Sequence, residues 1–543
     1  MLAYGLDIGN GYAMVALIDA GGTPRDCYPA RAWFMGQGTG MPTLCYVGMN
    51  GSIEVGEEGV ASNVARYPGR KVACIKRHLH EDAIVLSEDG KPLLDDRLQE
   101  QTVSPLDVYA AIVRKVVELA NEERLTSGAA PIYDVVLAHP ASFRDDVEDA
   151  GGSNRLRLLK QATEKVSFGD KSLHVVGMIP EPAAAAFEFL CAQEAQGAAG
   201  EGDRDPFCAI VYDLGYGTFD TAIVERQASP ETTSGFVYDV VGSPRSIEDV
   251  GCKDFDERLA AHMEHLLKEE YSYEPRNDIA RERILHGAIN VKHRLSKDTE
   301  ASFQMPSDRG DPMRITVTRN EFESITWGLL NLTLQCFKEM LDYAASSGLD
   351  ITDIVLSGGG SLMPMVREGV QKLMEDVQAL MPGTEVTIHN PASAAAYGAA
   401  RYAEAVAMPA PVPAPAPVPA PPPHAILNQY TQHAYGVLEG SEEVSILVNR
   451  GSKLPARASV EYTCDGDYTE LWVYRIDREA TPGTAVARND CTSVFRFGFS
   501  VPANEACTFE FICEENGSLT MACTRPDDNT TLRRNSFEIW AGR

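Results

Sequence analysis

Short apolar runs alternate with longer amphipathic segments over the first four hundred residues. The run YDVVLAHPASF, residues 133–143, is typical of a strand, and a segment rich in Leu, Arg, Lys and Glu follows it. Because strands and helices alternate in this way, we predict an α/β domain. After residue 424 the pattern changes to short runs such as VSILVN, LWVYRI and FEFICE, separated by Gly, Asp, Asn and Pro. These runs predict antiparallel strands that form a β-sandwich of about a hundred residues.

A proline-rich segment separates the two patterns. Residues 408–423 read MPAPVPAPAPVPAPPP, an alternation of Pro with Ala or Val that can form neither a helix nor a sheet. As polyproline II this segment would span roughly 50 Å and act as a semi-rigid spacer. We therefore expect an α/β domain over 1–407, a linker over 408–423 and a β-domain over 424–543. A plain tether is favoured over a docking site for a proline-binding module.

One strand–turn–strand pattern occurs twice in the α/β part. YGLDIGNGYAMVALID begins at Tyr4, and IVYDLGYGTFDTAIVE begins at Ile210; both contain Asp-x-Gly-x-Gly. Two copies about two hundred residues apart predict a duplicated fold with one hairpin from each half and a cleft between two lobes.

Composition narrows the range of partners. The formal net charge is -30, so we expect neither nucleic acid nor a membrane surface as a partner, because both are themselves anionic. The 12 cysteines are scattered without a CxxC pair, which is typical of reduced thiols. We recognise neither a leader peptide nor a long apolar run, and we expect a soluble, cytoplasmic protein.

The turns of the repeated hairpins are candidate phosphate-binding loops. The glycines of 9–11 and 215–217 allow backbone amides to approach a phosphate closely. Asp7 and Asp213 lie at or near the ends of the preceding strands and could hold a hydrated Mg2+ from both sides. Either hairpin taken singly would be an ordinary turn, whereas two equivalent hairpins favour a nucleotide site.

A third glycine cluster, SGGGS at 357–361, follows the apolar run ITDIVL and precedes the helical segment PMVREGVQKLM. A strand, a Gly-rich loop and a helix in this order can admit a base or a phosphate. The loop is not a Walker motif, because no GK[ST] follows it. A tight turn explains this cluster equally well when it is taken singly.

Together these motifs resemble the heat shock protein 70 (DnaK-like) chaperones. The matching stretches keep the family's order from about Leu2 to Ala405, and more faintly through the tail. They are YGLDIGNGY, VACIKRHLH, VVLAHPASFRDD, IPEPAAAAFEF, VYDLGYGTFDTAIVE, VGCKDFDERLAAHM, VKHRLSK, IVLSGGGSLMPMV and NPASAAAYGAARYA. The resemblance implies the actin-like ATPase fold, with two lobes built on duplicated ribonuclease H-like sheets, ATP or ADP with Mg2+ in the cleft, and a C-terminal antiparallel β-sandwich.

Carried over by position, the resemblance also implies roles for single residues. Lys76 would face the γ-phosphate, and Glu181 and Asp220 would position the attacking water or assist the metal. Asp7 and Asp213 would orient Mg2+ through water. The implied catalytic residues are Lys76, Glu181, Asp213, Thr218 and Asp220. The implied nucleotide contacts are Asp7, Gly9, Asn10, Gly11, Tyr12, Gly215, Tyr216, Gly217, Lys292, His293, Ser296, Gly358 and Gly359.

The phosphate loops depart from the family pattern. Asn10 and Gly11 stand where the family usually has two threonines, and Tyr216 replaces the middle glycine of DLGGGT. The Tyr216 side chain would either crowd the phosphates or point to solvent. These changes bear on ATP turnover more than on nucleotide binding. Pro140 in AHPASF would sit at the family's proposed interlobe switch.

The base-binding side departs as well. His293 replaces an arginine that stacks on the base, Ile289 replaces a glutamate, and Ala392 stands where NPDEA supplies an acid. Stacking by His293 and an ordinary exposed helical histidine are both open readings. We therefore expect looser recognition of the base.

The linker and the tail differ most. The family joins its domains with a short acidic and leucine-rich strand that docks on the ATPase domain, whereas proline cannot donate to a sheet edge. We therefore expect no docking of that kind, and little control of the β-domain by the ATP state. Leu471 and Cys464 fall where the family lines its peptide pocket, although ordinary sandwich core is the favoured reading. The given sequence runs to Arg543, and we expect a β-domain without the family's helical lid.

The first hypothesis is an Hsp70-like chaperone that binds Mg-ATP, hydrolyses it slowly to ADP and phosphate, and holds peptide or client segments in its β-domain. A J-domain co-chaperone and a nucleotide exchange factor are the partners that the resemblance implies. The alternative is a nucleotide-sensing scaffold with little turnover, whose β-domain is a dedicated interaction module. A filament-forming actin-like protein or a sugar kinase is the third and weakest hypothesis.

Overall fold

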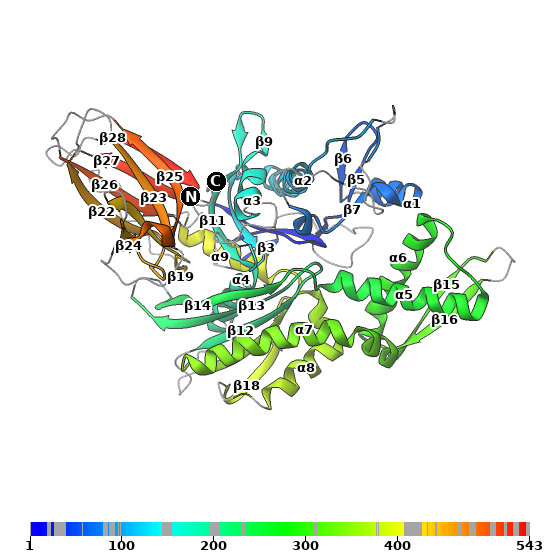
Figure 1. Ribbon diagram of the computed structural model, residues 1–543. Coiled ribbons are helices and arrows are strands. Elements are labelled where there is room, and N and C mark those ends of the chain that lie inside the picture. Colours follow the sequence, from blue (N-terminus) through cyan, green and yellow to red (C-terminus); the bar gives the residue numbers. More distant parts are fainter. Residues whose placement is uncertain are drawn as a thin grey trace.

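Two six-stranded sheets form the framework of the α/β part, and a five-stranded and a four-stranded antiparallel sheet form the C-terminal part (Figure 1). The structure is a computed structural model that describes residues 2–18, 23–26, 40–56, 58–79, 85, 93–95, 97, 99–143, 155–195, 207–230, 232, 234–307, 312–375, 377, 380–406, 426–431, 433–439, 443–463, 469–476, 485–499, 506–514, 518–524 and 531–538. The α/β pattern and the antiparallel tail that the sequence predicts are both confirmed.

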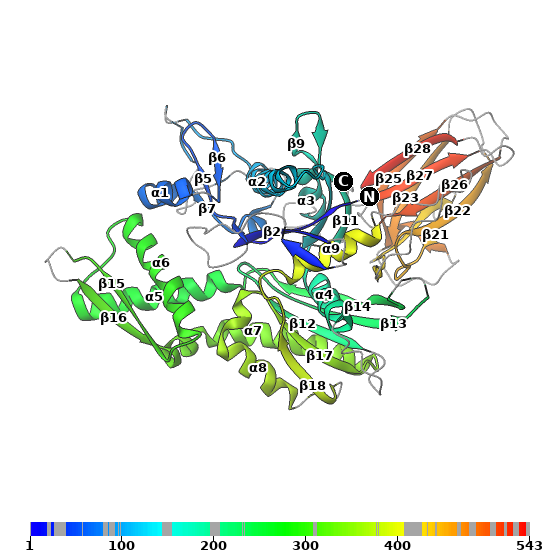
Figure 2. The same cartoon turned by 180° about the vertical axis from the view of Figure 1, so that it is seen from behind.

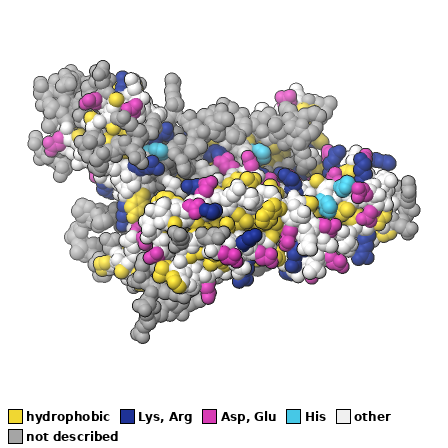
Figure 3. All heavy atoms as spheres, turned by 60° about the horizontal axis from the view of Figure 1, so that its bottom comes forward, with side chains coloured by type: hydrophobic (Ala, Val, Ile, Leu, Met, Phe, Trp, Pro, Cys, Tyr) yellow, Lys and Arg dark blue, Asp and Glu magenta, His cyan; other side chains and the backbone are white. Residues whose placement is uncertain are grey.

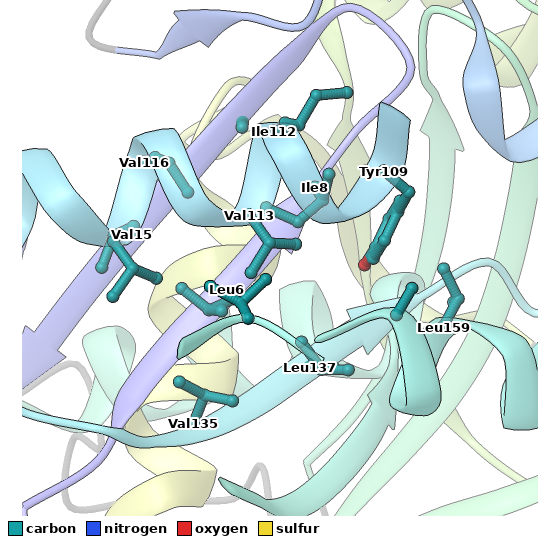
Figure 4. Packing of buried hydrophobic residues seen from close by; sticks show 14 of the residues in the cluster. Leu6, Ile8, Val15, Tyr109, Ile112, Val113, Val116, Val135, Leu137 and Leu159 are labelled. Atoms are coloured by element: carbon teal, nitrogen blue, oxygen red, sulfur yellow. The ribbon is translucent and has the colours of Figure 1, made fainter. Parts of the chain in front are cut away.

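The first sheet carries the first repeated hairpin. Its strands and covering helices are β1 (Tyr4–Ile8), β2 (Tyr12–Ile18), β3 (Pro24–Asp26), β4 (Met41–Pro42), β8 (Asp134–His139), β11 (His174–Pro180), α2 (Pro105–Thr126) and α3 (Arg155–Glu164). The order is β11-β8-β1-β2-β3, with β4 beside β2; β1 is antiparallel to β2 and parallel to β8. Apolar side chains of α2 pack on those of β1 and β8 (Figure 4). The start of α2 is fixed by a capping box between Ser104 and Asp107.

The second sheet repeats this arrangement. Its elements are β12 (Cys208–Leu214), β13 (Phe219–Ala228), β14 (Phe236–Ile247), β17 (Ile351–Ser357), β18 (Leu380–Ile388), β19 (Ile426–Asn428), α7 (Arg319–Ser346) and α8 (Pro364–Met374). The order is β18-β17-β12-β13-β14-β19, and β12 is antiparallel to β13 and parallel to β17. Five strands therefore match the first sheet in order and direction, which confirms the duplication that the sequence predicts.

Two helices lie between the sheets, α4 (Glu181–Ala195) and α9 (Ala394–Val406) (Figure 2). One buried cluster joins them to strands of both sheets, including β8 and β12. The helices are rich in alanine because they cross at close range. A Cβ on Gly398 would lie 1.9 Å from the Ala184 carbonyl oxygen, and one on Gly5 would lie 2.2 Å from the Ala400 nitrogen. The two lobes therefore meet across a thin, tightly packed layer.

Smaller elements extend each lobe. The first lobe adds β5 (Cys45–Val47), β6 (Ile53–Val55), β7 (Lys71–Val72), α1 (Glu58–Arg66), the hairpin β9 (Ser167–Phe168) and β10 (Lys171–Ser172), and the 3-10 turns η1 (Pro68–Arg70) and η2 (Ile75–His78). The second adds α5 (Cys252–Tyr271), α6 (Asp278–Leu295), β15 (Glu300–Met305), β16 (Met313–Thr318) and η3 (Gly359–Leu362). These extensions carry Lys76 on η2 and Lys292 on α6.

The C-terminal sheets face each other across a buried core. One sheet has the order β24-β21-β20-β23-β25 and the other β22-β26-β27-β28. Their elements are β20 (Ala434–Glu439), β21 (Glu443–Val448), β22 (Ala456–Thr463), β23 (Thr469–Ile476), β24 (Ala485–Ala487), η4 (Arg488–Asp490), β25 (Cys491–Phe499), β26 (Ala506–Cys513), β27 (Ser518–Thr524) and β28 (Thr531–Glu538). Side chains from both sheets, among them Leu471 and Phe509, form one cluster. Leu471 is thus a core residue here, and Cys464 lies outside the described residues.

The segment after the proline run docks on the second sheet. The predicted linker, 408–423, and both of its boundaries lie outside the described residues. Beyond them, β19 pairs in parallel with β14, as in Asp239 opposite Asn428. Asp239 Oδ1 also accepts hydrogen bonds from Asn428 Nδ2 at 2.7 Å and Tyr430 Oη at 2.5 Å. The expectation that the Pro/Ala linker does not dock falls on residues outside the described part, whereas the strand that docks lies after it, where 426–428 contains no proline and keeps its amide donors.

The surface shows charges of both signs. On the face seen in Figure 3, Lys and Arg side chains alternate with Asp and Glu side chains. The described part of this face gathers no broad basic patch of the kind that nucleic-acid binding requires. None of the described helices combines the length and apolar character needed to cross a membrane.

Candidate functional site

The two repeated hairpins meet tip to tip between the lobes. Their turns close in the same way, because Gly9 N donates to Tyr12 O at 2.9 Å and Gly215 N donates to Thr218 O at 3.0 Å. The Asn10 side chain lies against the opposite turn, where a Cβ on Gly217 would come within 2.0 Å of Asn10 Nδ2. Glycine at this position is therefore a condition for contact between the hairpins.

Lys76 lies beside this contact. It sits on η2, its side chain is 2% exposed, and its Nζ is 2.5 Å from Glu181 Oε1 at the start of α4. Its backbone NH donates to Asn10 Oδ1 at 3.1 Å. Although burial lowers the pKa of Lys76, the carboxylates of Glu181 and Asp7 outweigh it and raise that pKa. Lys76 is therefore a cation that its neighbours hold in place. An exposed lysine beside Arg77 would lack these partners.

Three further carboxyl groups surround the lysine. Asp220 accepts from Ala141 N at 2.8 Å and from Thr218 Oγ1 at 2.7 Å. Burial, with the Glu181 carboxylate adding to it, raises the pKa of both Asp7 and Asp220 to about 7. Burial and the neighbouring carboxylates also raise the pKa of Asp213 well above its usual value.

This cluster fits a cation held through water. Asp7 Oδ1 is buried and has no hydrogen-bond partner among the described residues. Within the described part of the chain, this cluster has four acidic groups, and Lys76 is the cation that acts on Asp7 and Asp213, so positive charge is in deficit there. The part of the chain that the structure describes contains no group of three or more His, Cys, Asp or Glu placed to ligate a metal directly. The unpartnered Asp7 oxygen and the excess of acidic groups suit hydrated Mg2+, whose shell keeps several waters.

The third glycine loop closes against the second hairpin. Gly358 has a φ of 74°, and a Cβ there would lie 2.5 Å from Asp213 Oδ1. A side chain at this position would strain the backbone and collide with the site. By contrast, a Cβ on Gly359 would meet nothing within 4 Å, so the loop opens onto free space. Gly358 thus packs against the carboxyl cluster and Gly359 faces room that a ligand can enter.

Tyr216 packs sideways rather than pointing to solvent. Its ring is partly buried against the apolar cluster of the second lobe, and a Cβ on Gly11 would lie 2.9 Å from the Tyr216 Cβ. Burial raises the pKa of the phenol, and the nearby Asp256 carboxylate raises it further. The Tyr216 carbonyl also accepts from Lys253 N at 2.9 Å, at the start of α5. The tyrosine therefore helps to join the hairpin to α5.

The residues expected to contact the nucleotide base do not all face the same way. Lys292 is buried and pairs with Asp256, with 2.8 Å between Nζ and Oδ1. Ser296 Oγ donates to the Lys292 carbonyl at 3.3 Å, and His293 is exposed on the same helix. Lys292 also lowers the pKa of Tyr12, a phenol whose pKa burial raises overall. Lys292 and Tyr12 thus come near each other, while His293 faces outward.

Several residues that sequence reasoning missed bridge the lobes. Arg77 donates to Gly217 O at 2.8 Å and pairs with Asp254 at 2.6 Å. Ala141, which follows the expected switch residue Pro140, donates to Asp220 of the other lobe. The sequence carries a weak signal for Arg77, its place next to Lys76, and none for the partner 177 residues away.

Comparison with known proteins gives a consistent result. The family model described as "Hsp70 protein" matches residues 52–410. The "Chaperone protein DnaK" of Thermotoga petrophila is 27% identical over 484 residues, which cover 87% of this chain and 70% of the relative. The protein of the same name from Buchnera aphidicola is 30% identical over 324 residues, 59% of this chain and 45% of the relative. That of Deinococcus proteolyticus is 25% identical over 477 residues, 85% of this chain and 67% of the relative.

Proposed function

The chain belongs to the Hsp70 family, and from that premise we propose that it is a chaperone that binds Mg-ATP between its two hairpins. It hydrolyses ATP slowly to ADP and phosphate and holds peptide or client segments with its β-domain. The observation that carries the proposal is the buried Lys76–Glu181 pair, set among three further carboxyl groups where two equivalent glycine turns meet. The duplicated sheets support an actin-like ATPase built on two ribonuclease H-like halves.

The two turns and the charged groups beside them each have a role in such a site. The turns 9–11 and 215–217 present amides to the phosphates, and Lys76 offsets the charge that develops on the γ-phosphate. Glu181 and Asp220 hold the attacking water, and the raised pKa of Asp220 suits a proton acceptor near neutral pH.

Asp7 and Asp213 would hold a magnesium ion through its water shell. The bound ion supplies positive charge that offsets the charge of the nucleotide tail. Asp7 Oδ1, which is buried without a partner among the described residues, is the atom best placed to bind such a water. The family as a whole uses ATP or ADP with Mg2+ in this way.

The residues expected to contact the nucleoside support weaker recognition of the base. Lys292 already pairs with Asp256, and His293 is exposed, so neither is held ready for a base. Gly359 offers an open backbone surface, since a Cβ there would meet nothing within 4 Å. We propose that the chain holds the phosphates firmly and discriminates little between bases.

The β-domain and the docked strand carry the chaperone half of the proposal. The relatives are chaperones by name, and peptide segments, a J-domain co-chaperone and a nucleotide exchange factor are the partners that the family suggests. The ten free cysteines found among the described residues suit a reducing cytoplasm. Because β19 extends the ATPase sheet, the β-domain has a direct mechanical link to that sheet despite the proline segment.

A nucleotide-sensing scaffold with little turnover is the second candidate. The contacts of Asn10 with Gly217 and of Tyr216 with Gly11 favour it, since they hold the two hairpin tips together. A site closed in this way would exchange its nucleotide slowly and seldom hydrolyse it.

One experiment tests the proposal. Thermal unfolding of the full chain is measured with and without Mg-ATP and Mg-ADP, and phosphate release is followed in parallel. A hundredfold excess of ligand over Kd stabilises a binding protein by about 2.7 kcal/mol. We expect Lys76→Ala to abolish phosphate release, with exposed Lys372→Ala as the matched control. A shift without release supports the scaffold, and no shift with either nucleotide rejects both candidates.

A further inference from the structure

The short turn η2 contacts the tips of both repeated hairpins. The backbone NH of Lys76 donates to Asn10 Oδ1 in the first hairpin at 3.1 Å. The next residue, Arg77, donates from its Nε to the Gly217 carbonyl oxygen in the second hairpin at 2.8 Å. Cys74, just before η2, has a φ of 53°, a left-handed conformation that a side chain makes unfavourable. Such a conformation persists where surrounding contacts fix it, and here they come from both hairpins.

Two groups of the second lobe bind the Arg77 guanidinium. Besides the Gly217 carbonyl, it binds the Asp254 carboxylate as a fork, with 3.1 Å from Nη1 to Oδ1 and 2.6 Å from Nη2 to Oδ2. The side chains of Arg77 and Asp254 are only 12% and 18% exposed, so solvent screens the pair weakly. A planar guanidinium can span a carbonyl and a carboxylate, whereas a lysine ammonium group cannot match both. Arg77 of the first lobe therefore holds two separate groups of the second lobe in fixed positions.

The contact with Gly217 affects the second turn more than the helix beside it. Asp254 Oδ2 already accepts from Gly251 N at 2.7 Å, which caps the start of α5. Gly217, by contrast, is buried, and a buried carbonyl requires a donor, which Arg77 supplies. This bond fixes the peptide group between Gly217 and Thr218. Because a trans peptide places its C=O and N–H on opposite sides, the Thr218 amide then points away from Arg77.

We propose that Arg77 is a positioning residue of the nucleotide site, which aims the Thr218 amide at a bound phosphate and keeps the two hairpin tips in register. This inference rests on the proposed nucleotide site. Lys76 and Arg77 then act on the phosphates in different ways from one turn, since Lys76 supplies charge and Arg77 fixes the direction of a backbone donor. Donors that are oriented beforehand bind a phosphate more tightly than donors that must be ordered on binding.

Arg77→Met tests the inference, with Lys71→Met as the matched control. Each change removes one cation and one ion pair between the lobes, but the partner of Lys71 is Glu282 on α6. We expect Arg77→Met to bind Mg-ADP about tenfold more weakly and, without ligand, to exchange the amides of 215–218 with deuterium about tenfold faster. Lys71→Met should change neither by more than about twofold. With saturating Mg-ADP, the phosphorus NMR resonance of the β-phosphate should move in Arg77→Met alone, because only that variant loses an oriented amide.

Arg77→Lys separates the fork from the charge. The lysine keeps the positive charge and a long apolar stem, but it cannot hold the Gly217 carbonyl and the Asp254 carboxylate together. We therefore expect it to lose about as much affinity for Mg-ADP as Arg77→Met does. Normal binding by Arg77→Lys would mean that the charge alone matters, and would overturn the inference.

The outcomes separate the inference from the function beneath it. If the unmodified chain binds no Mg-ADP, the proposed function fails and the inference fails with it. If the chain binds and Arg77→Met binds equally well, the function stands and Arg77 only joins the lobes, whatever the exchange rate of the turn. Should both Arg77 variants unfold before they can be assayed, Arg77 is a structural residue and the inference is again overturned.

Discussion

In the described part of the chain, Asp7, Glu181, Asp213 and Asp220 cluster near the ammonium group of Lys76, which pairs with Glu181. Burial raises the pKa values of Asp7 and Asp220 to about 7, and the neighbouring Glu181 carboxylate adds to the effect. Binding of a divalent cation or of a proton at this cluster would therefore reduce the electrostatic repulsion among the carboxyl groups. Sites with such raised pKa values are where chemistry is commonly found.

The pH dependence of stability follows from the sign of this shift. An acid whose pKa is raised on folding binds more protons in the folded state, so the free energy of unfolding falls as pH rises from about 4 to about 7. Asp7→Asn removes the titration. We expect the stability of this variant relative to the original to grow by about 2 kcal/mol between pH 5 and pH 8, measured by urea unfolding. The exposed Asp170→Asn is the matched surface control. A constant difference would mean that Asp7 is already ionised when folded.

At the scale of residues, the sequence predicts the identity of most site groups but little of their geometry. The motif DIGNG identifies Asp7 and the first turn because Gly and Asp in this spacing suit a phosphate turn. The spacing does not predict the hydrogen bond between the Asn10 side chain and the Lys76 backbone. Nor does it predict that the Tyr216 side chain lies sideways against Gly11. Those contacts depend on a partner brought in by the fold, 66 residues away in the case of Asn10.

At the scale of elements, the crossing of α4 and α9 places the strictest limit on side-chain size. Both helices are alanine-rich, which the sequence shows plainly, but a run of alanines equally predicts an ordinary helix. The structure gives the reason for one small residue in particular, since the backbone of α4 leaves no room beside Gly398. The layer between the sheets is thin because of such positions.

Gly398→Ala should therefore destabilise the protein, by about 3 kcal/mol, because the added methyl group must displace the backbone at Ala184. Gly328→Ala is the matched control. Gly328 is also helical, but it is exposed on α7 and a Cβ there would meet nothing within 4 Å. This second change should stabilise by about 0.5–1 kcal/mol through helix propensity alone. Both are read from urea midpoints, and a tolerated Gly398→Ala would show that the two helices can separate.

The docked strand is an element that sequence reasoning missed. Attention to the proline run led to the expectation of a free tether, and the apolar residues after it were too few to stand out. Pairing with β14 depends on an open sheet edge and on the carboxylate of Asp239, which receives both Asn428 and Tyr430. Neither feature is local in sequence.

Removing the carboxylate should release the strand. In Asp239→Ala we expect the amides of 426–431 to exchange with deuterium about tenfold faster, because two hydrogen bonds to the strand segment are lost. Glu385→Ala, on the opposite edge strand of the same sheet, should leave these amides unchanged. Equal protection in all three proteins would show that backbone pairing holds β19 without the side chains.

At the scale of the whole molecule, the lobes are held together by charged pairs around the cleft. Lys71 of the first lobe lies 2.5 Å from Glu282 on α6, and Arg155 donates to Glu248 at 2.8 Å. A third pair, Arg77 with Asp254, lies at the hairpin contact, because Arg77 also donates to Gly217 O. The sequence does not predict these ion pairs, because the two residues of each pair are 93 to 211 residues apart and belong to no motif. The overall two-lobe plan, by contrast, follows from the repeated hairpin.

The Lys71–Glu282 pair allows the closure of the lobes to be measured, since its side chains are 10% and 20% exposed and neither residue is among the proposed nucleotide contacts. Lys71→Glu and Glu282→Lys each place like charges opposite one another, and each should lower the free energy of unfolding by about 1–2 kcal/mol. The double variant restores opposite charges and should recover most of that loss, giving a coupling energy of about 1 kcal/mol or more. Reversing the exposed Lys338–Asp342 pair on α7 in the same way should yield no more than about 0.5 kcal/mol, because solvent screens it. If nucleotide binds in the cleft, both single variants should also release it faster, while the double variant returns to the original rate. A double variant as unstable as the sum of the singles would mean that the lobes are joined at α4 and α9 alone, and that the charged rim follows closure without contributing to it.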